Sequence, residues 1–214
     1  MRKLLLSGSL LLAFSLLLYS VNRKDKGIHP LTTNTLLPNP VLATLPQKAK
    51  AAKAYARKKG FNTAVAFLID MREDAGKNRF FVYDMEADSV RMAGLVTHGR
   101  CNKIWLTGRQ YGNTIGCGCT SIGKYRVGNP YKGRFGDAYK LHGLDPSNSN
   151  AYARFVVLHS HECVPETPVY PSPICQSDGC PTVSAGFLRL LQKEINRSEK
   201  PVLLWIYDSE KKLD

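Results

Sequence analysis

The sequence RFVVLHSHECVPETPVYPSPICQSDGCPTVSAGF, residues 154–187, contains the side chains around which the rest of the chain is organised. Its apolar start, residues 155–158, predicts a buried strand that ends at His159, because a short apolar run bounded by polar residues is typical of such a strand. Ser177, Asp178, Gly179 and Cys180 come just before a helical pattern. This order predicts that a base and a nucleophile converge on one spot.

Cys180 and His159 have the chemistry of a nucleophile and its base. A thiol titrates at about pH 8.5, and a neighbouring imidazole and a helix N-terminus both favour the thiolate, which is the attacking species. Gly179 lets the backbone approach a reacting carbonyl, and the N–H groups of Gly179 and Cys180 are the predicted oxyanion donors, whereas Pro181 has no N–H. On spacing alone, such a pair is more often a core histidine and a structural cysteine.

Four further blocks lie upstream of this pair. They are Thr97-His98-Gly99-Arg100, residues 119–125 (CTSIGKY), residues 131–136 (YKGRFG) and residues 141–145 (LHGLD). Together with His159 and the Ser-x-Gly-Cys motif at 177–180, they resemble the murein branch of the L,D-transpeptidase catalytic-domain family (YkuD type), over about residues 47–208. Many members have histidine in place of Asp178, and arginine or asparagine shortly after the cysteine, in place of Pro181 and Thr182. These departures concern substrate contacts rather than the nucleophile.

The resemblance implies a fold that is mostly β with α (α+β), an L,D-transpeptidase-like β-sandwich or barrel with one or two packed helices. It implies that the Cys180 thiolate attacks the carbonyl of an L-centre in a peptidoglycan stem tetrapeptide, expels D-alanine and forms a thioester. The side-chain amine of a second stem then resolves the thioester into a crosslink. With water as acceptor, the protein would instead be an L,D-carboxypeptidase or endopeptidase. A non-catalytic cell-wall-binding module is the other alternative.

The resemblance also implies roles within the site. His159 is the predicted general base and His161, two residues further on, is the rival base; Ser177 is predicted to position the flap or the imidazole. The predicted substrate contacts in the matching blocks are His98, Arg100, Tyr131, Arg134 and His142. Structural roles for the two upstream histidines are the alternative. No cofactor is expected, and the absence of a Gly-Lys-Ser/Thr loop or dinucleotide fingerprint argues against a nucleotide site.

The remaining chain divides into a leader, an arm and one domain. Residues 1–21, with an apolar run over residues 4–21 after a basic start, predict a signal peptide or signal anchor. Residues 22–46 predict a linker, with a strand at 41–45 as the alternative, and residues 47–214 the catalytic domain.

Within the domain, periodicity predicts several elements. A helix over residues 47–59 is expected to stop at Gly60, and strands are expected over residues 64–69, 79–85 and 90–96. Residues 97–150 are rich in glycine and predict long connections, with a short strand at 124–127. Ser184 is expected to cap a helix over residues 185–196, before a last strand at 202–207.

Six cysteines in an exported chain suggest disulfides. If Cys180 stays a free thiol, Cys163 and Cys175 are expected to bridge, because they bracket the proline-rich flap between base and nucleophile. Cys101 is expected to pair with Cys117 or with Cys119, which leaves one thiol over. A zinc site of Cys117, Cys119, His159 and Cys163 is the alternative, but the spacing is not Cys-x2-Cys and no metal is expected.

The formal net charge is +13, to which the leader contributes only Arg2 and Lys3. A basic exported protein suits an anionic partner such as the cell wall or a membrane surface. Nucleic acid is not expected, because no basic stripe is interleaved with stacking aromatic residues. We therefore expect a periplasmic or cell-envelope protein. If residues 4–21 are not cleaved, they are expected to anchor it in the inner membrane. A monomer is expected.

Overall fold

The computed structural model describes residues 40–210. The predictions for residues 1–21, and for the arm as far as residue 39, lie outside this range. Within residues 40–210, no helix is both long enough and apolar enough to cross a membrane.

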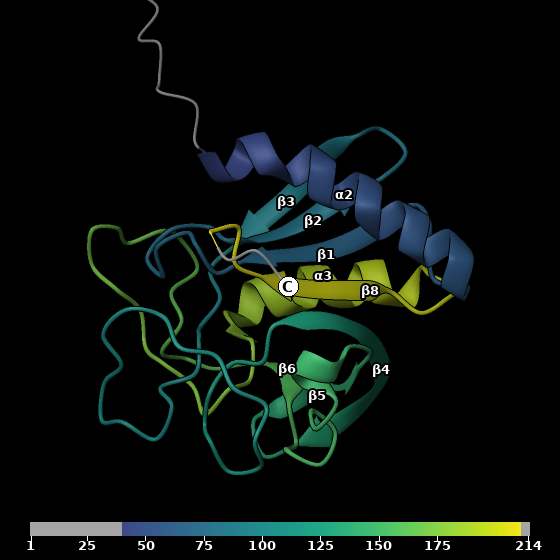
Figure 1. Ribbon diagram of the computed structural model, residues 1–214. Coiled ribbons are helices and arrows are strands. Elements are labelled where there is room, and N and C mark those ends of the chain that lie inside the picture. Colours follow the sequence, from purple (N-terminus) through teal and green to yellow (C-terminus); the bar gives the residue numbers. More distant parts are fainter. Residues whose placement is uncertain (1–39, 211–214) are drawn as a thin grey trace, which may run out of the picture. The chain divides into compact units, whose positions relative to one another are not determined.

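One mixed sheet of eight strands forms the centre of the described domain, in the order β3-β2-β1-β8-β4-β5-β6-β7 (Figure 1). Neighbouring strands are antiparallel except for the pairs β1 with β8 and β6 with β7, which are parallel. The strands are β1 (Val65–Asp70), β2 (Phe80–Asp84), β3 (Ser89–Gly94), β4 (Gly123–Gly133), β5 (Gly136–Gly143), β6 (Val157–Ser160), β7 (Thr182–Val183) and β8 (Leu203–Tyr207).

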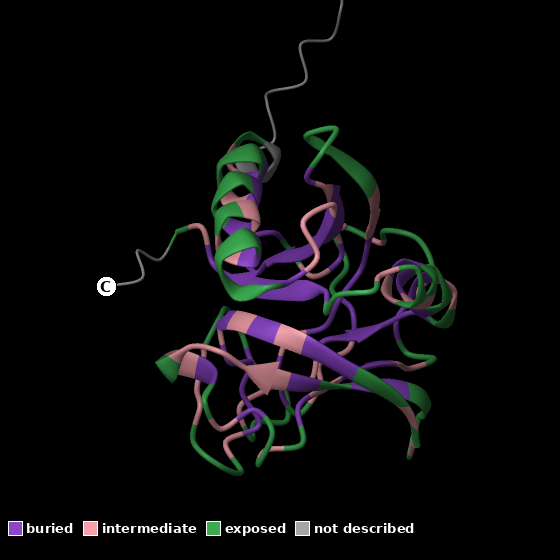
Figure 2. Ribbon diagram, turned by 90° about the vertical axis from the view of Figure 1, so that its right-hand side faces the viewer, coloured by how far each residue is buried: buried purple, intermediate pink, exposed green. Residues whose placement is uncertain are grey.

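Two helices, α2 (Pro40–Lys59) and α3 (Ala185–Asn196), cover opposite faces of this sheet (Figures 1 and 2). Successive side chains of β1 therefore enter two cores: Phe67 packs in the cluster that includes Leu191 of α3, whereas Leu68 packs in the cluster that includes Ala52 of α2. Because both faces are covered, all six residues of β1 are buried. The expectation of a mostly β domain with packed helices is confirmed.

Helix α2 begins earlier than the sequence pattern predicted, and it contains Pro46. A proline in a helix interior removes one backbone hydrogen bond, which is why the sequence of residues 40–46 predicts an arm or a strand instead. Leu45, Ala49, Ala52 and Ala56 form one fully buried stripe at helical spacing. Burial of this stripe against the sheet offsets the loss at the proline, and the expected end at Gly60, with φ of +74°, is confirmed.

The glycine-rich region holds more regular structure than its composition predicted. The expected short strand is the first part of β4, which continues to Gly133 and turns back as β5. The sequence pattern missed β5 because its apolar residues do not alternate cleanly, so pairing with β4 and β6, rather than local propensity, makes it a strand. The tip of this hairpin, residues 133–136, reaches the functional site described below.

The other expected elements are confirmed with small shifts in their ends. The hairpins β1-β2-β3 are antiparallel, and Ser184 caps α3 by accepting a hydrogen bond from the Phe187 amide. The strand before His159 differs: β6 begins at Val157, and Phe155 lies outside it, with φ of +55° and 83% of the residue exposed. His159 is paired with Ala138 on one side and Thr182 on the other, so it lies within the sheet rather than beyond its end.

Candidate active site

Cys180 and His159 line one cavity of about 440 Å³, although 21 positions separate them in the chain. Strand β6 carries His159, and the turn before β7 carries Cys180. Parallel pairing of β6 with β7 brings these two segments together. Other residues around the cavity include Thr97, Arg100, Trp105, Phe135, His161, Ser177 and Thr182.

The Cys180 thiol sits against the turn that precedes β6. The Val157 amide donates to Sγ at 3.5 Å, and Sγ lies 3.7 Å from the Phe155 carbonyl oxygen, to which the thiol can donate. Burial raises the pKa of this thiol, the Val157 amide and Arg154 oppose that shift, and Asp178 adds to it. Strand β7 and Ser184 lie between Cys180 and the first residue of α3, and an effect of this helix N-terminus on the thiolate stays a prediction.

His159 is buried and held in one tautomer by two hydrogen bonds. Its Nδ1 lies 3.0 Å from the Ser160 carbonyl oxygen and its Nε2 lies 3.0 Å from the Thr182 hydroxyl. Because a carbonyl oxygen can only accept, Nδ1 carries the proton and Nε2 offers its lone pair to the hydroxyl. Burial lowers the pKa of His159, so the imidazole is neutral near pH 7. This is the protonation state that a general base requires.

Phe135, at the tip of the β4-β5 hairpin, covers this imidazole. The two rings stack with centroids 4.8 Å apart and an interplanar angle of 17°. The same phenyl ring meets His161 edge-on at 5.5 Å. His161 lines the cavity too, but its Nδ1 accepts a hydrogen bond from the Cys163 amide at 3.1 Å, which leaves only Nε2 of that ring for proton transfer.

Ser177 shapes the turn that carries the thiol. Its hydroxyl donates to the Cys180 carbonyl oxygen at 2.7 Å and accepts from the Gly179 amide at 3.2 Å. Ser177 therefore forms hydrogen bonds within the turn that carries Cys180, whereas the Nε2 atom of His159 is hydrogen-bonded to Thr182. Gly179 has φ of +106°, and a Cβ atom there would lie 2.5 Å from the Cys119 carbonyl oxygen, so this position needs glycine.

Of the five predicted substrate contacts, Arg100 lines the Cys180 cavity, where its Nε lies 2.7 Å from Asp178. His98 lines a neighbouring cavity with Arg79, and burial lowers its pKa. His142 stacks on Tyr152 with ring centroids 5.2 Å apart. These two histidines lie outside the lining of the Cys180 cavity, which agrees with the alternative that they have structural roles.

Tyr131 and Arg134 lie on the β4-β5 hairpin and are likewise absent from the lining of the Cys180 cavity. The Arg134 guanidinium lies 5.5 Å from the centre of the Phe135 ring. Phe135 is the hairpin residue that enters the site, and the sequence pattern gave no signal that separates it from its neighbours. The sequence shows Thr182 only as a departure from the family pattern and gives no signal of its hydrogen bond to His159.

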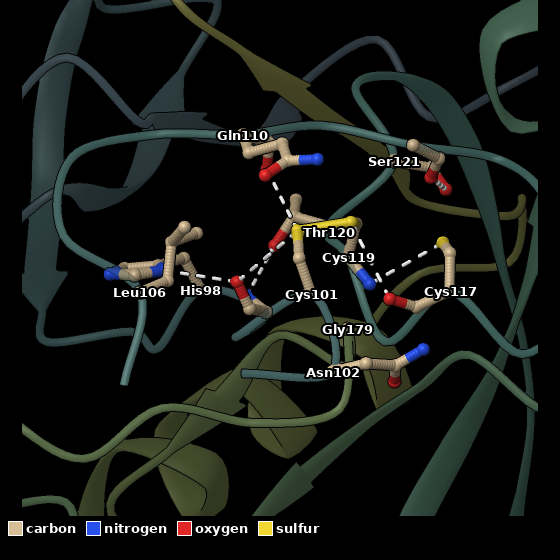
Figure 3. Close-up of a disulfide and its surroundings, with 12 residues drawn as sticks. His98, Cys101, Asn102, Leu106, Gln110, Cys117, Cys119, Thr120, Ser121 and Gly179 are labelled. Atoms are coloured by element: carbon tan, nitrogen blue, oxygen red, sulfur yellow. Dashed lines mark hydrogen bonds between the residues drawn. A yellow bond between two sulfur atoms is a disulfide. The ribbon is translucent and has the colours of Figure 1, made fainter. Parts of the chain in front are cut away.

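Two disulfides flank the site. Cys163 pairs with Cys175 across the flap, as expected, and Cys101 pairs with Cys119, one of the two partners considered (Figure 3). Cys117 and Cys180 are free thiols. The zinc alternative is wrong, because Cys119 and Cys163, two of its four ligands, are in disulfides.

Comparison with known proteins identifies the family of this chain. A model of the L,D-transpeptidase catalytic domain matches residues 41–207. No curated protein sequence matches the chain.

Solved structures with similarity are distant in sequence. One, described as the Ldtfm-avibactam carbamoyl enzyme, has 12% identity and a TM-score of 0.43 over 67% of this chain and 49% of that chain. The L,D-transpeptidase from Xylanimonas cellulosilytica has 16% identity and a TM-score of 0.38 over 72% and 68%. The helical cell shape determining protein Pgp2 from Campylobacter jejuni has 14% identity and a TM-score of 0.43 over 78% and 57%. The chain spans about half the length of the first of these.

Proposed function

We propose, from the premise that this chain belongs to the L,D-transpeptidase catalytic-domain family, that it is an exported cysteine acyltransferase acting on peptidoglycan stem peptides. The observation that supports this proposal best is that one cavity holds both the free Cys180 thiol and the neutral imidazole of His159. The two disulfides agree with export, because disulfides persist in oxidising compartments. The leader over residues 1–21 and a cell-envelope location remain predictions.

Proton transfer to His159 is needed in the first step. Because burial raises the pKa of the Cys180 thiol, it is protonated near neutral pH and must lose its proton as it attacks. The neutral His159 accepts that proton at Nε2, the nitrogen that now accepts from Thr182. The sulfur forms a bond to the carbonyl carbon of the L-centre, the carbon–nitrogen bond to D-alanine breaks, and the imidazolium protonates the leaving amine. General acid and base catalysis of this kind contributes about 100- to 10,000-fold.

Charge on the carbonyl oxygen develops during this attack. The Gly179 amide already donates to the Ser177 hydroxyl, so of the two predicted oxyanion donors we assign the role to the Cys180 amide. In the second step the amine of another stem attacks the thioester carbonyl, and the carbon–sulfur bond breaks. His159 takes a proton from that amine and returns one to the sulfur. The product is an L,D-type crosslink.

The test is intact-mass spectrometry of the purified full chain after incubation with a carbapenem. Wild type is expected to gain one covalent adduct, and Cys180→Ala to gain none while keeping its circular dichroism spectrum. Cys117→Ser is the matched control, because it removes the other free thiol and should acquire the adduct normally. An adduct on Cys180→Ala, or none on a folded wild type, would overturn the assignment of the nucleophile.

The acceptor is tested with a disaccharide tetrapeptide substrate. Loss of D-alanine with formation of a dimer is the expected result. Loss of D-alanine without any dimer, in the presence of excess acceptor stem, would mean that water resolves the thioester and that the protein is a peptidase.

A further inference from the structure

Arg154 lies just before β6 and hydrogen-bonds to one loop, residues 112–121, to which neither catalytic residue belongs. One terminal nitrogen of its guanidinium, Nη1, donates to the Gly112 carbonyl oxygen at 2.9 Å and to the Ser121 hydroxyl. The other, Nη2, donates to the Cys119 carbonyl oxygen at 2.6 Å. These contacts fix the plane of the guanidinium, because two separate nitrogens are bonded to groups in one loop.

The same guanidinium reaches the backbone of the nucleophile turn. A Cβ atom built on Gly179 would lie 2.5 Å from the Cys119 carbonyl oxygen and 3.1 Å from Nη2 of Arg154. The α-carbon of Gly179 therefore packs directly on the hydrogen bond between these two groups. Cys180 is the next residue, so displacement of Arg154 would free the turn that positions the thiol.

The residue after Arg154 presents its own backbone to the sulfur. Phe155 has φ of +55°, a conformation that costs a residue with a side chain roughly 1–2 kcal/mol, and the residue is 83% exposed. Burial of the ring thus does not explain the strained backbone. This conformation places the Phe155 carbonyl 3.7 Å from Sγ of Cys180, with the Val157 amide at 3.5 Å. The segment 154–157 therefore forms one wall around the thiol.

The charges that surround the thiol come from several elements. Asp178, on the same turn, is paired with Arg100. His159 on β6 is neutral near pH 7, and Tyr125 on β4 donates its hydroxyl to the Ser121 carbonyl oxygen. Among the groups found to affect the pKa of Cys180, Arg154 is the cation and lowers it. A negative sulfur formed during attack would therefore be stabilised by the fixed charge of Arg154, in addition to the imidazolium that His159 becomes.

We propose that Arg154 is a positioning residue for Cys180, which holds the Gly179–Cys180 backbone in its reactive geometry and supplies the positive charge that stabilises the thiolate. This rests on the proposed role of Cys180 as nucleophile. Lysine could replace the charge but not the geometry, because an ammonium group lacks the rigid planar fork that bonds Gly112, Ser121 and Cys119 together.

The experiment measures alkylation of Cys180 by iodoacetamide as a function of pH, read at the level of the modified peptide so that Cys117 is counted separately. Wild type, Arg154→Gln and Arg154→Lys are compared. Arg57→Gln is the matched control, because it makes the same change at an exposed position on α2. Circular dichroism establishes that each variant is folded, and carbapenem acylation rates are recorded in parallel.

Arg154→Gln is expected to raise the midpoint of the alkylation profile by about one pH unit, because an opposite charge close to an ionising group shifts it by that order. At pH 7 its alkylation should fall about tenfold. Arg154→Lys is expected to keep the wild-type midpoint but to be acylated about 10- to 100-fold more slowly, since misplacement of a reacting atom costs that much. Arg57→Gln should match wild type in both.

A folded Arg154→Gln with the wild-type midpoint would overturn the proposed charge effect. If that variant does not fold, Arg154→Lys still decides the positioning role, because a wild-type acylation rate would overturn it. Alkylation needs no peptidoglycan and no acyl acceptor. Wild type that shows the expected profile but forms no acyl-enzyme would thus contradict the proposed function and leave the role of Arg154 standing.

Discussion

Gly179→Ala is the perturbation for which the structure gives the clearest magnitude. A residue with a side chain at φ of +106° is strained by about 1–3 kcal/mol. The new Cβ atom would also lie 2.5 Å from the Cys119 carbonyl oxygen, which belongs to the backbone and cannot rotate away. Overpacking of this kind costs about 1–3 kcal/mol. The two costs together give about 4 kcal/mol of lost stability.

Thermal unfolding followed by circular dichroism measures this loss. For a domain of this size, about 4 kcal/mol corresponds to a fall in Tm of about 8–16 °C. Gly60→Ala is the matched control, because Gly60 also has positive φ, +74°, but a Cβ atom there would meet nothing within 4 Å. Gly60→Ala should lose only the stability that the backbone strain costs, about 1–2 kcal/mol, and should keep the wild-type rate of acylation.

The rate of carbapenem acylation supplies a second readout for the same pair of variants. Gly179→Ala is expected to be acylated at least about 100-fold more slowly, because the turn must move away from Cys119 and takes the Cys180 thiol with it. If Gly179→Ala lost no more stability than Gly60→Ala and was acylated at the wild-type rate, the close packing of the nucleophile turn on Cys119 would be wrong.

Three further predictions follow from the same contacts. Phe135→Ala exposes His159 to water and should raise the pKa of that imidazole, so the acid limb of the acylation profile moves to higher pH; an unchanged limb would contradict this. Burial lowers the pKa of His98 and His159, so the unfolded chain binds more protons than the folded chain. The free energy of unfolding, measured in urea, should therefore have its full value above about pH 6.5 and decrease as the pH falls from there through the folded pKa values of the two histidines. A free energy of unfolding that stays constant over this range would refute the prediction. The double variant Cys163→Ser/Cys175→Ser removes a disulfide with a sequence separation of 12. Its free energy of unfolding should be about 3 kcal/mol lower than that of wild type, and its acylation by a carbapenem should be slower. Wild-type values of both quantities would exclude a role for the flap.

Much of the sheet follows from local pattern. The strands β1, β2 and β8 are apolar runs bounded by turn residues, and α3 has a Ser184 cap and a buried stripe of Phe187, Leu188 and Leu191. Such features depend on the repeat of the backbone over a few residues, so a short window of sequence contains them. Strand β5 lacks that pattern, and its pairing with β4 and β6 was invisible in the sequence.

The two disulfides likewise differ in whether the sequence alone predicts them. Cys163 and Cys175 bracket one flap, so the two ends of their disulfide lie in one short segment, and the sequence predicts this pairing correctly. Cys101 had two candidate partners only two positions apart, and the path of the loop, with positive φ at Gly118, decides for Cys119. The spacing of cysteines does not contain that path.

The sequence by itself determined which residues have the chemistry of a nucleophile and its base, because motif and residue type are properties of short segments. It also determined the apolar runs that enter the two cores. The tertiary structure alone decided that Thr182 holds the His159 ring, that Phe135 covers it, and that Arg154 lies against the Cys180 turn. These contacts join segments far apart in the chain, and they form only when strand register and loop path bring the side chains within a few ångströms of one another.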